Sequence, residues 1–108
     1  MKKLVESFIA TANDFDVEGA LSLFATDAVI DDVSVGDAFV GRDGVRQYLE
    51  WFFVGYNTAS KLLSIEELDP FRSRVRFDFT GDFGHEIGIM KIAINATGLI
   101  ERIDADLE

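Results

Sequence analysis

Residues 72–79 read RSRVRFDF, and this stretch has the most regular alternation in the chain. Successive side chains of a β-strand point to opposite faces of the sheet, so the polar and apolar sets separate. One face would carry Ser73, Val75, Phe77 and Phe79, and the other Arg72, Arg74, Arg76 and Asp78. The alternation predicts a strand with one side packed on a core and the other side in water.

The segments around this strand predict further strands. Asp69-Pro70 before it is a turn signal, and residues 81–84 after it, bounded by two glycines, predict a hairpin connection. We expect the other strands of this half at 61–68, 86–95 and 99–107, with a turn at 96–98. Links this short make neighbouring strands antiparallel.

The first half of the chain has helical periodicity instead. Leu4, Phe8 and Ala12 belong to an apolar stripe at helical spacing that ends at Asn13-Asp14. Asp16 is a candidate N-cap for a second helix whose inner residues would be Ala20, Leu21 and Phe24. A short strand at 28–33, a polar stretch around 36–37 that Gly41 closes, and a third helix at 43–56 complete this half. Helices followed by strands predict one α+β domain over residues 1–108.

The composition narrows the classes of partner. Twenty acidic residues against ten basic ones give a net charge of −10, which disfavours nucleic acid and anionic membrane surfaces. There is no cysteine, so neither disulfides nor thiolate chemistry is expected. Polar residues interrupt the apolar positions behind Lys2-Lys3, so we expect no signal peptide, no membrane span and a cytoplasmic location. We also expect no cofactor and no metal, because the single histidine, His85, lacks ligand partners.

Several short motifs together resemble a known family. They are Phe8-Ile9-x-x-Ala12, Gly19-Ala20, Leu23-Phe24-Ala25, Asp27-Ala28, Asp31-Asp32, Phe39-x-Gly41 and the aromatic third helix. In order and spacing the chain resembles the nuclear transport factor 2-like superfamily, nearest to its SnoaL-like polyketide-cyclase and steroid Δ-isomerase branches. The resemblance covers essentially the whole chain. It implies a cystatin-like cone, in which a curved antiparallel sheet wraps around about three N-terminal helices and encloses an apolar pocket.

The resemblance also implies where catalytic groups would stand. The isomerase branch uses an Asp base, a Tyr hydroxyl and a protonated Asp, and these positions fall on Asp32, Phe8 and Met90. Two of the three groups are therefore replaced by side chains without a donor, which argues against steroid isomerisation by that route. The carboxylate and Arg positions of the epoxide-hydrolase branch fall on inward residues such as Gly88, Met90, Ile103 and Ala105. The cyclase branch needs only an Asp or His as acid or base, and Asp32 is compatible with it.

The candidate site residues are one carboxylate and a set of apolar or aromatic side chains. Asp32 is the candidate catalytic base; the other possibility is a solvated carboxylate at a strand end beside Asp31. The candidate ligand-binding residues are Phe8, Phe24, Phe39, Tyr48, Phe52, Tyr56, Phe77, Phe79, Met90 and Ile103. The sequence does not distinguish a pocket wall from solid core for these residues. His85 and the arginine row at 72–76 are expected to lie at an exposed or interface surface.

Two functions from different classes remain open at this point. The first is a cofactor-independent isomerase, cyclase or lyase that acts on a small apolar carbonyl compound with Asp32 as general base. The second is a non-catalytic member of the fold that binds an apolar ligand or mediates assembly, which the loss of donors at Phe8 and Met90 favours. We expect a homodimer through the outer sheet face in either case, because Ile87 and Ile89 lie on that face near the arginine row.

Overall fold

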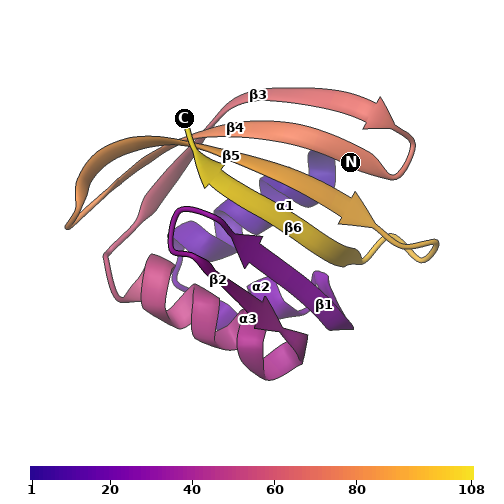
Figure 1. Ribbon diagram of the computed structural model, residues 1–108, viewed down its shortest axis with the longest axis horizontal. Helices are drawn as coiled ribbons and strands as arrows, with labels where there is room; N and C mark the ends of the chain where they lie inside the picture. Colours follow the sequence, from indigo (N-terminus) through magenta and orange to yellow (C-terminus); the bar gives the residue numbers. More distant parts are fainter.

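The computed structural model describes residues 1–108. Six strands form one sheet: β1 (Phe24–Asp32), β2 (Asp37–Val40), β3 (Ala59–Asp69), β4 (Arg72–Gly81), β5 (Gly84–Ile94) and β6 (Ile100–Leu107). Their order in the sheet is β2-β1-β6-β5-β4-β3, and every neighbouring pair is antiparallel except β1 and β6, which run parallel. The sheet is curved and unclosed, with β2 and β3 at its two ends (Figure 1).

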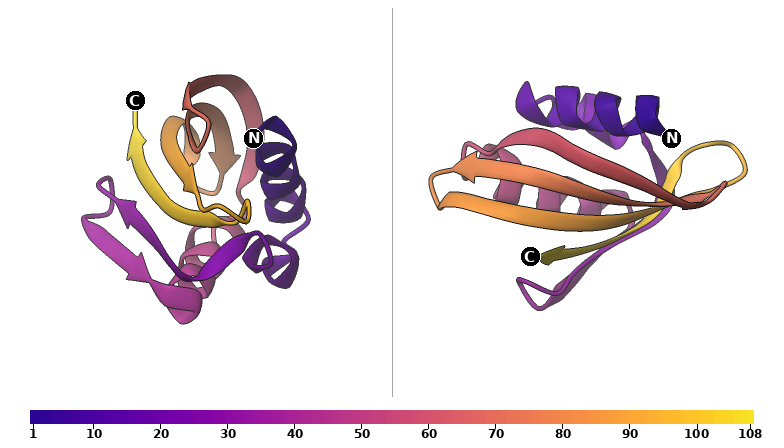
Figure 2. Two further views of the ribbon diagram at one scale, coloured as in Figure 1. Left: turned by 90° about the vertical axis from the view of Figure 1, so that its right-hand side faces the viewer. Right: turned by 90° about the horizontal axis from the view of Figure 1, so that it is seen from above.

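Two helices precede the sheet, and the other helical segments connect its two edge strands, β2 and β3. They are α1 (Lys2–Asn13), α2 (Val17–Leu21), α3 (Gly41–Leu49) and a single π-helical turn, η1 (Glu50–Val54). α1 packs against β3, whereas α3 packs against β1 and β2, and α2 contacts both longer helices. Figure 2 shows the resulting arrangement, in which the sheet curls around the helical side of the molecule. The predicted α+β class and the curved sheet are confirmed.

A side-chain amide fixes the end of α1 to the edge of the sheet. The Asn13 Nδ2 group donates to the Ser60 carbonyl at 3.0 Å, and the Ser60 N–H donates to Asn13 Oδ1 at 2.7 Å. The two bonds occupy both backbone groups of a residue on the outermost strand, where one side of the backbone lacks a neighbouring strand. Asn13, predicted only to end the helix, therefore also holds β3.

The strand predictions of the second half are confirmed. On β4, the side chains of Ser73, Val75, Phe77 and Phe79 are buried, as the alternation predicts. β3, β5 and β6 begin and end within two residues of their expected limits. The Asp16 cap of α2 is confirmed as well, because its Oδ1 accepts the Gly19 N–H at 2.9 Å.

Three expectations for the first half are wrong in detail. β1 begins at Phe24 instead of residue 28, because Phe24 pairs with Ile100 ahead of a register shift that ends at Val29. The stretch before Gly41 contains the short strand β2, which pairs with the end of β1. The third helix begins at Gly41, and its regular part ends at Leu49 before it widens into η1, so it does not run unbroken to residue 56.

The core lies between the helices and the concave face of the sheet. A cluster of 21 buried apolar side chains fills this space. Phe8 stands near its centre and makes edge-to-face contacts with Phe24 and Phe53, at ring-centroid distances of 6.1 and 5.9 Å. Phe77 stacks on Phe79 at 5.2 Å. Such aromatic pairs add to the free energy gained from burial of their area. None of the helices combines the length and the apolar character that crossing a bilayer requires.

Candidate functional site

A cavity of about 280 Å³ opens beside the core, between the end of α3, η1, the ends of β1, β4 and β6 and the first half of β5. Its wall is formed by sixteen residues, eleven of them hydrophobic. They are Asp32, Ser34, Val35, Tyr48, Phe52, Phe53, Tyr56, Thr58, Phe79, Phe83, Glu86, Ile89, Met90, Ala105, Asp106 and Leu107. An apolar wall with a few polar groups is typical of sites for small molecules.

Asp32 is the most buried charged side chain of this wall. It ends β1 on the same face as Ala28 and Ile30, so the alternation of the strand turns it inward and turns Asp31 outward. The residue is 6% exposed. The structure thus places Asp32 at the cavity and not at a solvated strand end.

Three groups donate hydrogen bonds to the Asp32 carboxylate. The Tyr48 hydroxyl donates to Oδ2 at 2.6 Å. The Ser34 hydroxyl donates to Oδ1 at 2.5 Å, and the Ser34 N–H donates to the same oxygen at 3.0 Å. A carboxylate offers about four acceptor positions, so one position on Oδ2 is left for a ligand. The hydrogen bonds compensate for the loss of water around a buried charge and fix the orientation of the group.

Tyr48 reaches Asp32 from α3 and is itself enclosed by aromatic rings. Its ring lies 5.1 Å from that of Phe39 and 5.0 Å from that of Phe52, and the residue is 4% exposed. Burial raises the pKa of Tyr48 well above its usual value, and the negative charge of Asp32 raises it further. The hydroxyl therefore keeps its proton and acts as a donor toward Asp32.

The π-helical turn supplies much of the aromatic wall. Within η1, both Phe52 and Phe53 reach the cavity although they are adjacent in sequence. Phe53 contacts Phe79 on the sheet at 6.1 Å, and Phe52 lies 6.0 Å from Tyr56 near the cavity opening. π-helical turns are rare and frequently occur at functional sites.

The predicted ligand-binding residues divide between this cavity and the core. Tyr48, Phe52, Tyr56, Phe79 and Met90 line the cavity with Asp32. The other five pack into the core and are not part of the cavity wall: Phe8, Phe24, Phe39, Phe77 and Ile103. Phe8 is separated from the cavity because the rings of Phe24 and Phe53 pack against it.

Some wall residues escaped the sequence analysis. Ser34 follows Asp32 by two residues, the spacing at which an Asp side chain accepts bonds from the backbone of a turn. Glu86 has the same strand parity as Gly88 and Met90, which would have placed it on the inner face. Phe53 follows Leu49 by four residues and Val45 by eight, and this helical spacing would have placed it on the inner face.

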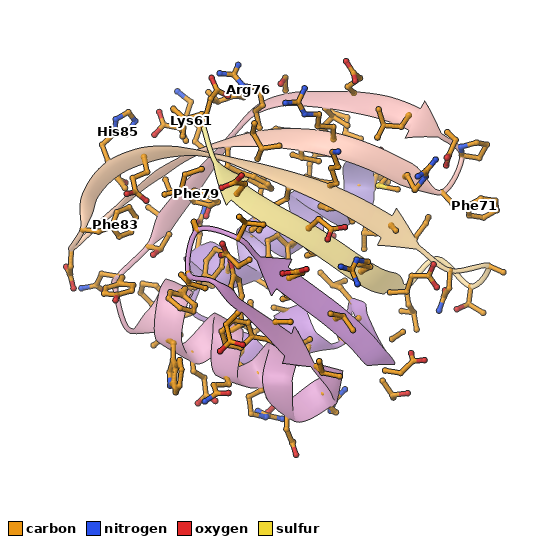
Figure 3. All side chains as sticks on the ribbon, viewed as in Figure 1. Lys61, Phe71, Arg76, Phe79, Phe83 and His85 are labelled. Carbon is orange, nitrogen blue, oxygen red and sulfur yellow. The ribbon has the colours of Figure 1, made fainter.

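The histidine and the arginines lie outside the cavity wall. His85 is exposed, and its Nε2 atom lies 2.6 Å from Asp78 Oδ1 on the neighbouring strand. Arg76 pairs with Glu108, and its NH2 nitrogen lies 2.6 Å from Glu108 Oε1. Figure 3 shows Arg76, Lys61 and His85 on the convex side of the sheet, whereas Phe79 lies beneath it. No group of three or more His, Cys, Asp or Glu side chains is arranged to hold a metal ion.

Comparison with known proteins shows which family and which solved structures resemble this chain. The model of the SnoaL-like domain matches residues 5–98. No curated protein has a sequence that matches at a significant level. Among solved structures, the chain is similar to SalBIII, described as an epoxide hydrolase/cyclase-like enzyme in pyran ring formation in the polyether salinomycin. The identity is 18%, the match covers 99% of this chain and 89% of that chain, and the TM-score is 0.86.

Two further structures of this fold hold or were designed to hold steroids. RV0760c from Mycobacterium tuberculosis, in complex with estradiol-17β-hemisuccinate, is 18% identical, with 94% and 88% of the two chains covered and a TM-score of 0.83. A computationally designed 17-OHP binder is 17% identical, with 94% and 86% covered and a TM-score of 0.83. At these identities the likeness shows the fold alone. The family match covers most of the sequence, and the chain therefore belongs to the SnoaL-like domain family.

Proposed function

We propose that this protein binds a small, mainly apolar carbonyl compound in the cavity and acts on it as a cofactor-independent isomerase or cyclase, with Asp32 as general base. The observation that carries the proposal is a buried carboxylate that keeps one acceptor position at an apolar cavity. A positioned base of this kind typically contributes about 10²–10⁴ to a rate.

The chemistry follows from the groups in the wall. Asp32 Oδ2 would accept a proton from the carbon next to the carbonyl, and the electron pair of that C–H bond would move into the carbonyl to give an enolate. Ser34 and Tyr48 keep the carboxylate oriented through the transfer. Return of the proton to a different carbon gives an isomer, whereas attack of the enolate carbon on a second electrophilic centre closes a ring. In the first outcome Asp32 gives its proton to the new carbon. In the second, the electrophilic centre is a second carbonyl whose C=O π bond breaks as the ring closes, and Asp32 gives its proton to the resulting alkoxide oxygen, so both outcomes return Asp32 to its starting form.

A binding protein without chemistry is the second candidate, and one observation favours it. Phe8 and Met90 stand where the isomerase branch has hydrogen-bond donors, and neither side chain has a donor. Phe8 lies in the core away from the cavity wall, so it is also not in contact with a ligand there. The similar structures support both candidates, because one is described as a cyclase-like enzyme and two hold or were designed to hold steroids.

Binding is tested first, with a thermal-shift screen of small apolar ketones and enones. A ligand at ten times its dissociation constant stabilises the folded state by about 1.4 kcal/mol. For a 108-residue domain this corresponds to roughly 6 °C in the melting temperature, since unfolding entropy is about 2.1 cal/mol/K per residue. A screen in which no compound shifts the melting temperature argues against both candidates.

Proton transfer is tested next, with the ketones that bind. In D₂O, general-base action exchanges the hydrogens next to the carbonyl for deuterium, which NMR follows directly. We expect Asp32→Asn to lower this exchange by about 100-fold or more while binding persists. Asp31→Asn is the matched control, because Asp31 is the adjacent carboxylate on the opposite face of β1. Exchange that is the same in Asp32→Asn as in the natural protein contradicts the role of Asp32, and binding without any exchange favours the second candidate.

A further inference from the structure

The charged groups of the cavity wall are all acidic. Asp32, Glu86 and Asp106 line the cavity, and no Lys, Arg or His is part of its wall. None of the three carboxylates takes part in any of the seven ion pairs of the chain. Asp32 already accepts three hydrogen bonds, and Asp106 pairs with Ile89 on the face opposite to that of Ala105. Glu86 is therefore the wall carboxylate that faces the cavity without a partner in the protein.

Glu86 is directed into the site by its place on the sheet. On β5 it has the same parity as Gly88 and Met90, which are buried on the inner face, and it pairs across the ladder with Phe79, whose side chain also points inward. It stands near the open end, where its carboxylate remains exposed to water. Its charge is solvated and belongs to none of the ion pairs of the chain, so it is available to a cationic group of a ligand.

The arginines that form ion pairs do so outside the cavity wall. Arg42 and Arg46 pair with Glu18. Arg102 pairs with Asp31 and Asp104, and Arg76 pairs with Glu108. Arg76 and Lys61 project from the convex side of the sheet, away from Phe79 (Figure 3). The protein thus has no basic side chain at the cavity to offer an anionic ligand.

The opening combines this negative charge with exposed aromatic faces. Tyr56 and Phe83 meet edge to face at 6.0 Å, and both line the cavity. Aromatic faces attract cations through the ring quadrupole, most strongly when the cation is partly removed from water. Carboxylates next to aromatic rings are the groups that recognise a protonated amine.

We propose that the ligand of this cavity carries a basic nitrogen, held as an ammonium group at the opening by Glu86, with the rings of Tyr56 and Phe83 around it. Its apolar body lies along Phe52 and Phe79 and ends near Asp32. The cavity of about 280 Å³ equals roughly nine times the ~30 Å³ share of a water molecule in the liquid, which suits about nine to twelve non-hydrogen atoms. This inference rests on the proposed function, since it names the substrate class for the same cavity.

The experiment compares three probes of nearly equal shape and different charge. They are 2-phenylethylamine, the neutral 2-phenylethanol and the anionic 3-phenylpropanoate, with binding followed by NMR titration at pH 7 and low salt. We expect the amine to bind at least tenfold more tightly than the alcohol, and the carboxylate to bind more weakly than either. Raising the salt concentration to 0.5 M should reduce the preference for the amine and leave the alcohol unchanged.

Two variants test whether the preference for the amine arises from Glu86 at the opening of the cavity. Glu86→Gln should weaken amine binding three- to tenfold and leave alcohol binding unchanged. Glu101→Gln is the matched control, because Glu101 is an exposed glutamate of β6 outside the cavity wall, and it should change neither. If the alcohol binds as tightly as the amine, or if Glu86→Gln has no effect on the amine, the charge inference is wrong while the proposed cavity function stands. If none of the three probes binds while a ketone of the thermal-shift screen does, the charge inference is wrong and the proposed function stands. If the ketones fail to bind as well, both are contradicted.

Discussion

Replacement of Tyr48 by Phe isolates the hydrogen bond that joins α3 to the end of β1. The Tyr48 hydroxyl donates to Asp32 Oδ2 at 2.6 Å, and both residues are buried. A hydrogen bond to a charged acceptor contributes about 1.5–3 kcal/mol to stability. The ring contacts with Phe39 and Phe52 remain in Tyr48→Phe, so we expect a loss of about 2 kcal/mol, or roughly 9 °C in the melting temperature.

The pH dependence of this loss tests its cause. The pKa of Tyr48 is raised in the folded protein and returns to about 10 on unfolding. The contribution of this residue is complete below pH 10 and is lost as the pH rises above the unfolded value, because only the unfolded hydroxyl then ionises. Between pH 10 and 11 the natural protein should lose up to about 1.4 kcal/mol more than Tyr48→Phe.

Urea unfolding at several pH values measures both effects, and Tyr56→Phe provides the control. Tyr56 is 44% exposed and its hydroxyl makes no hydrogen bond within the chain, so its replacement by Phe should change stability by less than about 0.5 kcal/mol. If Tyr48→Phe proves as stable as the natural protein at pH 7, or if the two proteins lose stability in parallel above pH 10, the hydroxyl does not donate to Asp32 as described.

Three further predictions concern the frame around the site. Gly88→Ala places a methyl group 2.4 Å from the Phe79 ring, which must move against its stacked neighbour Phe77, so urea unfolding should show a loss of about 1–3 kcal/mol; unchanged stability would mean that the ring has room to move. Asn13→Ala removes both hydrogen bonds to Ser60, so the free energy of unfolding should fall by about 1–2 kcal/mol and hydrogen exchange of the Ser60 amide should become faster. Unaltered exchange would show that these two bonds do not hold β3. The expected homodimer should appear as twice 12.0 kDa in sedimentation at micromolar concentration, and a monomer there refutes it.

The sequence predicted the parts of the fold that depend on local pattern. The alternation at residues 72–79 is sufficient to define β4, because buried and exposed residues follow one another without interruption. The start of β1 was not predictable in this way. Phe24 joins the strand through a parallel pairing with Ile100, 76 residues away, and an irregular segment separates that pair from Val29. Pairing across such a distance leaves no periodic signal in the chain.

The site was predictable to a similar extent. Asp32 was a candidate because of its position in the chain, but its partner Tyr48 comes from another element and is brought to it by the packing of α3 on β1. Phe8 was a candidate that does not line the cavity. Its helical spacing predicts that it points inward, but does not tell whether it faces a cavity or another side chain. Phe24 of β1 and Phe53 of η1 occupy the space next to it, and the periodicity of α1 does not reveal this.

The hydroxyl groups of the cavity wall determine how the two proposed functions differ. The wall has four hydroxyls, and three of them already donate inside the protein: Ser34 and Tyr48 to Asp32, and Thr58 to the Phe52 carbonyl. Tyr56 is the one left to donate to a carbonyl oxygen of a ligand. An enolate formed at Asp32 needs such a donor, because a hydrogen bond aimed at developing negative charge supplies much of the catalytic effect. Because Tyr56 is close to the opening, the carbonyl would have to lie toward the mouth while the acidic carbon lies deeper, near Asp32. A ligand that binds in the reverse direction would be held and not transformed.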